Sequence, residues 1–417
     1  MSNEVYTKRK YVVLVALFIT WIVNYLDKLS MNVAIIPITE EFGLTTSQAG
    51  MVLGVFFLSY AIMQLIGGYL SDRFGARIVI IISVLLWSIF TVITGLAWSL
   101  ASLIIIRFFF GLAEGSFPSA STLSIAENFP KKERGRAKSV LTAATTVGAI
   151  VATLLSAVLI TQMGWRNLFF SFGVMGVVLT VILVFALKPS KSKVKEKEEK
   201  PKVSLKKVLT APMVFQLMLI YFGVSMTNWG LSSWMPTYLV KVKNLEMIEM
   251  GSLAVIPGLA GLVTALSIGL LLDKIKPGLE KFVIAAGTVF AAISLYLMTT
   301  VDAIGLIVTF QSLTTVGTMT AATAVLIMPL KYFSHEIIGT STGIVYFGGQ
   351  MAGAVAPTVM GFVISIFNNS YNAAFLFLMI MILISTVTAF FVKIKPENKD
   401  QQERSNKDIQ NELAEVK

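Results

Sequence analysis

The stretch YVVLVALFITWIVNYLDKLSMNVAII, residues 11–36, decides the fold class of this chain of 417 residues. A helix of this length crosses about 30 Å of bilayer hydrocarbon, at about 1.5 Å per residue. Its middle nevertheless carries two adjacent charges, Asp27 and Lys28. A charge at the bilayer centre costs about 2.5–3.5 kcal/mol on insertion scales. We therefore expect both side chains to have a task that offsets this cost.

The composition of the whole chain is that of a membrane protein. Hydrophobic residues make up 55% and charged residues only 14%, whereas soluble domains carry about 25% charged residues. The apolar runs do not alternate in polarity, as strands of a membrane barrel would. We predict an all-α membrane protein of twelve transmembrane helices in two six-helix bundles. The predicted spans are 11–36, 47–70, 78–97, 101–129, 139–163, 167–187, 211–239, 249–272, 282–300, 303–330, 337–366 and 371–392.

The two halves of the chain resemble each other. Asp72 and Asp273 follow the second and eighth spans and are 201 residues apart, and the pairs Asn24-Tyr25 and Asn228-Trp229 are 204 apart. Two offsets that agree within three residues indicate a duplicated six-helix unit, as in many secondary transporters. The predicted parts are an N-terminal bundle (1–187), a cytoplasmic linker (188–210), a C-terminal bundle (211–392) and a polar cytoplasmic tail (393–417).

The basic residues predict the orientation of the chain in the membrane. Lys28 and Arg107 fall within spans, and Arg166, Lys241 and Lys243 fall in loops on one side. All other members of the 34 Lys and Arg lie on the side that holds the two termini. Because Lys and Arg collect in cytoplasmic loops, we expect both termini in the cytoplasm. The short loops favour a bacterial inner membrane.

Three motifs together resemble a known family. GGYLSDRFGARIV (67–79) strongly resembles the loop signature of the major facilitator superfamily, which is repeated in degenerate form at Asp273. VNYLDK (23–28) and RFFFGLAEGSFPS (107–119) resemble the anion:cation symporter branch. That branch includes bacterial hexuronate, galactonate and other sugar-acid transporters and, more distantly, sialin and the vesicular glutamate transporters. The resemblance implies the major facilitator fold and transport by alternating access.

The loop signature is expected to act as part of a gate. Gly68 and Gly75 permit close helix approach and a tight turn. Asp72 is expected to cap a neighbouring helix or to pair with a cation. The remaining members of the set are Arg73, Arg77 and Asp273, of which the two arginines would face lipid phosphates and cytoplasmic carboxylates. The alternative is that the loop only determines topology.

Four charges are predicted inside the membrane: Asp27, Lys28, Arg107 and Glu114. Arg107 and Glu114 are two turns apart, so they share one helix face, about 10.5 Å apart along the axis. That face must point into the bundle, where Gly111 allows close packing. Asp27 and Lys28 differ by about 100° around their helix, so they are expected to have different partners.

Charge counting predicts coupling of an anion to protons. Two acids and two bases make the empty site neutral, and protonating both acids leaves it at about +2, which suits an anion. The resemblance implies that Asp27 and Glu114 carry protons and that Arg107 tunes the nearby acid. It also implies that Tyr25, Lys28 and Tyr60 contact substrate. The alternative is a static ion-pair network, although buried pairs seldom stabilise more than apolar residues do.

One residue departs from the branch, which usually has arginine where this chain has Lys28. Lysine offers a compact charge instead of a two-pronged clamp, and it can lose its proton when buried. Further polar or aromatic side chains are candidates for binding substrate hydroxyls or for contacts between helices. These candidates are Gln64, Asn228, Trp229 and Gln350.

The predicted function is secondary active transport, by proton-coupled symport of an organic anion such as a sugar acid. No ATPase loop or metal-ligand cluster is evident and there is no cysteine, so we expect no cofactor, no metal and no enzyme activity. The expected partners are a small organic anion, protons and the lipid bilayer, without nucleic acid, and the protein is expected to be a monomer. The alternatives are a multidrug or cationic-compound antiporter, an organophosphate:phosphate exchanger and a non-transporting membrane sensor or scaffold.

Overall fold

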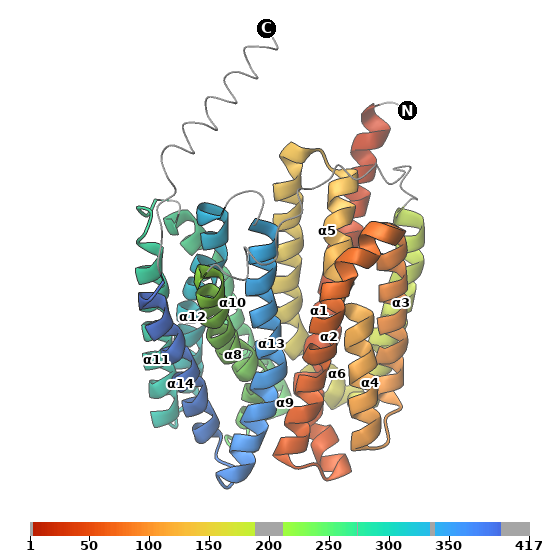
Figure 1. The fold of residues 1–417 in the computed structure, drawn as a ribbon. Coiled ribbons are helices and arrows are strands. Elements are labelled where there is room, and N and C mark those ends of the chain that lie inside the picture. Colours follow the sequence, from red (N-terminus) through yellow and green to blue (C-terminus); the bar gives the residue numbers. More distant parts are fainter. Residues whose placement is uncertain (1–2, 188–211, 273, 334–337, 393–417) are drawn as a thin grey trace.

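The computed structural model describes residues 3–187, 212–272, 274–333 and 338–392 as a bundle of helices joined by short turns (Figure 1). The helical membrane fold is therefore confirmed. The predicted linker at 188–210, the tail at 393–417 and Asp273 lie outside the described residues.

The N-terminal half contains the spans expected before the linker. α4 and α5 together form one span, which is interrupted at Gly115 and Ser116. The helices are α1 (Asn3–Phe42), α2 (Thr46–Phe74), α3 (Ala76–Gly95), α4 (Leu100–Glu114), α5 (Phe117–Asn128) and α6 (Lys131–Ala186).

The C-terminal half supplies the other six spans. α9 and α10 form one interrupted span, the second of this half, whereas the interruption of the first half lies in its fourth span. The helices are α8 (Pro212–Lys241), α9 (Met247–Leu253), α10 (Val255–Leu272), α11 (Glu280–Thr300), α12 (Ile304–Tyr332), α13 (Ile338–Ile366) and α14 (Tyr371–Phe390).

Helix α6 supplies two spans. By length and composition the described residues contain 11 helices able to cross a membrane, with residues 132–186 counted once. A straight helix of 56 residues would be about 84 Å long, well beyond one bilayer. Gly164 interrupts it with φ 81°, a conformation that glycine adopts without strain. Ser156 on one side contacts α1, and Gly176 on the other packs against α3. The described residues therefore provide twelve spans.

An even number of spans returns the chain to its starting side. α1 begins and α14 ends at the same end of the bundle (Figure 1). Short capped turns join the spans at the opposite end: Thr45 and Gln48 form a reciprocal capping box at the start of α2, and Ser99 and Ser102 form another at the start of α4. These caps satisfy main-chain donors that the first helical turn leaves open.

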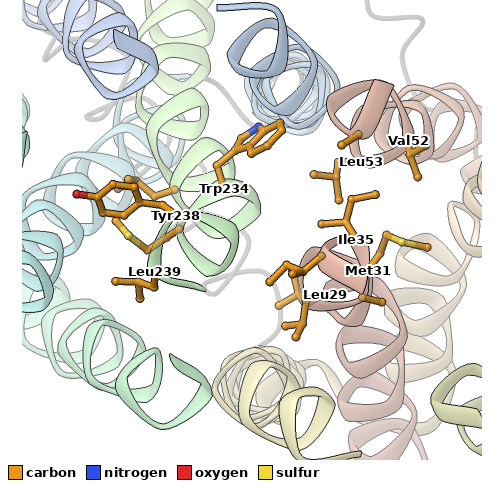
Figure 2. Packing of buried hydrophobic residues seen from close by; sticks show 14 of the residues in the cluster. Leu29, Met31, Ile35, Val52, Leu53, Trp234, Tyr238 and Leu239 are labelled. Carbon is orange, nitrogen blue, oxygen red and sulfur yellow. The ribbon is translucent and has the colours of Figure 1, made fainter. Parts of the chain in front are cut away.

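The two halves meet at the end of the bundle where α1 finishes. One apolar cluster joins α1 and α2 of the first half to α8 and α13 of the second. Figure 2 shows Leu29, Ile35 and Leu53 on one side of this cluster and Trp234 and Tyr238 on the other.

Glycines bring α2 and α13 together along a seam. A Cβ added to Gly50 would lie 2.5 Å from the Pro357 carbonyl oxygen, and one added to Gly54 would lie 2.1 Å from the Thr358 hydroxyl oxygen. Gly361 approaches the main chain of α2 in the same way. We call Gly50, Gly54 and Gly361, with their contacts, the glycine seam. Such close approach is possible only without side chains.

Contacts between the halves stop near the middle of the bundle. Glu40 and Lys241 form an ion pair at the end where α1 finishes. The ring of Phe57 lies 4.5 Å from that of Trp229, about halfway along the spans. Within the described ranges, the hydrogen bonds, ion pairs and ring contacts between the halves lie between these two levels. The bundle is therefore closed at the end away from the start of the chain.

Candidate functional site

All four charges predicted inside the membrane are buried in the N-terminal half. The exposed fractions are 1% for Asp27, 5% for Lys28, 2% for Arg107 and 0% for Glu114. The expectation that the shared face of Arg107 and Glu114 points into the bundle is confirmed. Gly111 lets α4 pack closely against α2. A Cβ added at this position would lie only 2.4 Å from the Phe56 carbonyl oxygen.

Lys28 and Glu114 form a buried ion pair. The Lys28 ammonium lies 3.2 Å from Glu114 Oε1. The Asn24 amide donates to the same oxygen at 2.5 Å, and Glu114 Oε2 has no hydrogen-bond partner. One carboxylate oxygen thus serves two donors from α1 while the other stays available. Sequence analysis used Asn24 only to detect the repeat, although its spacing of four residues from Lys28 places both on one helix face.

Aromatic rings surround the Lys28 ammonium. It lies 4.3 Å from the ring centroid of Tyr60, 5.0 Å from that of Tyr25 and 5.5 Å from that of Phe56. The ring faces attract a cation without neutralising it. Tyr25 and Tyr60 were predicted at this site, whereas Phe56 was not, because an apolar ring in an apolar span carries no distinctive sequence signal.

Asp27 is not hydrogen-bonded to this pair. Neither carboxylate oxygen has a hydrogen-bond partner of ordinary geometry, although the side chains of Glu114, Arg107 and Thr91 lie near enough to interact with it. Thr91 itself donates to the Trp87 carbonyl at 3.0 Å. The expectation that Asp27 and Lys28 have different partners is confirmed.

The direct contacts that the structure describes for the Arg107 guanidinium are with aromatic rings and not with carboxylates. It lies 4.9 Å from the ring centroid of Phe56 and 4.8 Å from that of Phe110. It forms no ion pair within 4 Å among the described residues, and its Nε atom is buried without a partner. Its charge therefore acts on both Glu114 and Asp27 without a direct ion pair.

The C-terminal half contributes polar and aromatic groups at the same depth. The Asn228 carbonyl oxygen accepts a hydrogen bond from Thr318 at 2.8 Å, and Trp229 packs on Phe57. Gln64 and Gln350 are half-buried, and neither side chain forms a hydrogen bond with a described residue.

Two tyrosines that sequence analysis missed lie opposite Tyr25. The rings of Tyr221 and Tyr346 are 5.9 Å apart, and both lie near enough to Tyr25 to interact electrostatically across the two halves. Tyr346 is nevertheless 43% exposed, so the space between the halves is open at this level. The spacing of seven residues between Tyr221 and Asn228, two helical turns, was the signal available.

The loop signature departs in part from its expected contacts. Gly75 has φ 83° between α2 and α3, which confirms the tight turn. A Cβ added to Gly68 would meet no atom within 4 Å, so its expected role in close packing is wrong in this conformation. The adjacent Gly67 meets Ser116 instead, at 2.6 Å from a Cβ added there, because consecutive residues point about 100° apart.

The charged members of the loop signature were also expected to have partners. Asp72 is exposed and neither caps α3 nor forms an ion pair with a described residue, so that expectation is wrong in this conformation. Arg73 donates to the Tyr69 hydroxyl at 2.8 Å, and Arg77 donates to the Val184 carbonyl at 3.1 Å.

Comparison with known families identifies the fold. The model of the Major Facilitator Superfamily matches residues 14–357 and 281–416. The chain belongs to the Major Facilitator Superfamily. It is therefore a membrane transporter and not an enzyme. The gate-like loop and the buried charges described above lie within the matched region.

Curated relatives match the anion:cation symporter branch. A probable sulfoacetate transporter of Cupriavidus necator is 27% identical, over 92% of this chain and 94% of the relative. A probable galactarate/D-glucarate transporter of Escherichia coli is 28% identical over the same shares. A probable L-galactonate transporter of Escherichia coli is also 28% identical, over 84% of this chain and 82% of the relative.

Solved structures share the fold. A bacterial homologue of the human lysosomal transporter Spinster, in an inward-facing and unoccupied conformation, superposes with a TM-score of 0.81 at 18% identity, covering 94% of this chain and 98% of that one. A D-xylose-proton symporter superposes with a TM-score of 0.74 at 17% identity, covering 93% and 98%.

Proposed function

We propose that this protein is a secondary active transporter that moves a small organic anion, a sugar acid or related carboxylate, together with protons. The observation that carries the proposal is the buried Lys28–Glu114 pair, in which one ammonium group has one carboxylate partner. The relatives, whose names state galactarate, glucarate, galactonate and sulfoacetate, support this class of cargo.

The ion pair links anion binding to proton binding. A substrate carboxylate that reached Lys28 would meet a second carboxylate, Glu114, on the same cation. Two buried anions on one cation are unfavourable, because each charge removed from water needs its own compensation. A proton on Glu114 removes the conflict and frees Lys28 for the substrate. Proton and anion therefore bind together, which is the condition for symport.

Asp27 and Arg107 form a second, looser acid and base. Protonation of Asp27 would leave Arg107 as an uncompensated cation and raise the attraction of the site for an anion. The site is neutral when empty and deprotonated, and carries about +2 when both acids are protonated. Movement of more protons than substrate charges would also draw on the membrane voltage, at about 2.3 kcal/mol per charge and 100 mV.

Neutral groups would bind the rest of the cargo. Tyr25 and Tyr60 from the first half and Asn228 and Trp229 from the second offer hydroxyl, amide and ring surfaces. Gln64 and Gln350 complete the proposed pocket, since their amides form no hydrogen bond with a described protein group. Because these groups come from both halves, the affinity for substrate would depend on the relative position of the two halves.

The distribution of Lys and Arg supports cytoplasmic termini in a bacterial plasma membrane. The closed end with Glu40 and Lys241 would then be external, and the conformation would face inward. We assign gating to the loop signature at Gly68, Asp72, Arg73, Gly75 and Arg77 and to its second copy at Asp273, which would acquire partners in the opposite conformation. A monomer suffices for this scheme.

The test uses purified protein in liposomes that contain a pH-sensitive dye, with potassium and valinomycin to clamp the voltage. Galactarate, glucarate, L-galactonate and sulfoacetate are added singly. We expect at least one to acidify the lumen, and Glu114→Gln and Asp27→Asn to abolish this. Asp302→Asn, which removes an exposed carboxylate far from the site, is the control and should leave it unchanged. Anion movement without acidification, or acidification that survives both substitutions, would refute proton symport.

The same liposomes test the rival functions. Export of a lipophilic cation driven by protons would indicate a drug antiporter, and exchange of glycerol phosphate for phosphate would indicate a phosphate exchanger. The buried Lys28 argues against a cationic cargo, because a second cation there would be repelled.

A further inference from the structure

Lys138 of α6, like Arg73 of α2, has a hydroxyl rather than a carboxylate as its hydrogen-bond partner near the end of the bundle where α1 begins. Its ammonium donates to the Thr122 hydroxyl of α5 at 2.9 Å, and no carboxylate of the described ranges pairs with it. By contrast, Lys10 pairs with Glu133 at 2.6 Å, and Arg134 donates to two main-chain carbonyls at the end of α5. Lys138 thus combines a full positive charge with a neutral partner.

Helix α6 turns Lys138 toward the space between the halves. Steps of four residues place Thr142 and Thr146 on the same side. Ser156, five turns beyond Lys138 on the same face, contacts Ser30 of α1, and Ala157, which contacts Gly251 of the other half, lies about 100° further round the helix. The opposite face of α6 presents exposed apolar side chains, as expected toward lipid. These are Val140, Val147 and Val151.

Lys138 lies along the open approach to the buried charges. Gly148 of α6 packs on Tyr25 and so marks the level of the central site. Lys138 is ten residues nearer the start of α6, about 15 Å along the axis. The described contacts between the halves lie on the other side of this level, and the exposure of Tyr346 indicates that the opening reaches it.

We propose that the Lys138 ammonium and the Thr122 hydroxyl form a second binding station for the carboxylate of the organic anion, between the Lys28 site and the aqueous phase at this end of the bundle. The nature of the anion rests on the proposed function. A carboxylate oxygen can accept from the ammonium while the hydroxyl donates to the other oxygen. Because Thr122 is neutral, no carboxylate of the described residues competes for Lys138, whereas Glu114 competes for Lys28.

The second station is expected to attract anions but to bind them weakly. An exposed ammonium attracts carboxylates and raises their local concentration, but solvent and salt weaken the attraction. An anion that leaves Lys28 would therefore meet a second cation about 15 Å away before it enters bulk water. The station would mainly lower the anion concentration that half-saturates transport at this face.

One experiment measures binding without transport. Purified protein is treated with trinitrobenzenesulfonate at pH 8.5, and modification of Lys138 and of Lys132, an exposed lysine on the same helix, is followed by mass spectrometry. We expect galactarate, L-galactonate or sulfoacetate to slow the modification of Lys138 about three- to tenfold. Uncharged galactitol should not slow it, and Lys132 should react equally throughout.

A second experiment measures transport with the anion presented to each face of oriented proteoliposomes. Lys138→Gln should raise the half-saturating concentration about three- to tenfold at the face nearer Lys138 only. Lys138→Arg should restore it, and Lys132→Gln should have no effect.

The outcomes separate the two proposals. If an anion is transported but neither protects Lys138 nor depends on it, the station is refuted and the proposed function stands. If an anion protects Lys138 and none of the panel is transported, the proposed function is refuted and the station stands. Failure of both readouts for every anion refutes both.

Discussion

Replacement of Lys28 by methionine would test whether the buried ion pair is held by its charge. The substitution leaves Glu114 buried with the Asn24 amide as its remaining partner. Breaking a buried pair from one side costs about 3–5 kcal/mol. The proton that would neutralise an ordinary carboxyl group at pH 7 costs about 3.7 kcal/mol, at 1.36 kcal/mol per pH unit. The two estimates agree, so we expect a loss of about 4 kcal/mol at pH 7.

The thermal unfolding temperature of the detergent-solubilised protein measures this loss. With an unfolding entropy of about 2.1 cal/mol/K per residue, the expected decrease is about 3–6 °C. The decrease should shrink toward pH 5, where the neutralising proton costs only about 1 kcal/mol. The double substitution Lys28→Met with Glu114→Gln should recover most of the lost stability, because no buried charge is then left unpaired.

Lys243→Met provides a matched control, since it removes an ammonium from an ion pair with an exposed carboxylate. Exposed pairs contribute about 0.2–1 kcal/mol, so the change should stay near 1 °C or below. The reasoning is refuted if Lys28→Met is as stable as the parent at pH 7, or if adding Glu114→Gln lowers stability further.

Three further predictions concern the glycines and the exposed ion pair. Gly54→Val should prevent closure of the glycine seam. Pairs of cysteines introduced into the cysteine-free chain and spin-labelled should then report distances of the opposite conformation. An unchanged distance distribution would contradict the role of the seam. Gly75→Ala should lower the unfolding temperature by about 1–3 °C, because its backbone conformation costs other residues about 1–3 kcal/mol, and Gly68→Ala, with open space around it, should not. The hydrogen bond from Lys243 lowers the pKa of Asp302 and raises that of Lys243. The stabilisation relative to Asp302→Asn should therefore persist from about pH 5 to 9 and disappear as the pH falls below about 4; a difference that grows in acid would contradict this assignment.

The spans and their number followed from the sequence because a bilayer leaves few alternatives. Each main-chain polar group must be satisfied within a helix, so an apolar run of sufficient length is a span. The burial of Arg107 and Glu114 was predictable for the same reason, since both lie on one helix face and neither tolerates lipid. The different partners of Asp27 and Lys28 followed from the angle between neighbouring residues.

The pairing of the charges did not follow from the sequence. Which acid faces Lys28 depends on how α1 and α4 are rotated against each other, and that rotation is set by packing of Gly111 and Gly115 on α2. The contacts of Tyr221 and Tyr346 across the halves also depend on the conformation the halves adopt. Gly67 rather than Gly68 makes the close contact because a shift of one residue turns a helix face by about 100°.

The glycine seam also bears on how fast the halves can part. Gly50, Gly54 and Gly361 have no rotamers of their own, so few side chains, chiefly Thr358 and Trp234, rearrange when α2 and α13 separate. Separation also breaks the hydrogen bond that Thr358 donates to the Gly50 carbonyl. Dispersion attraction is only about 0.1–0.2 kcal/mol per atom pair and falls steeply with distance. The attraction across the seam is therefore lost within the first ångström or so of movement. The glycine seam therefore stabilises the closed contact between α2 and α13, but it resists further separation little once the two helices have begun to move apart.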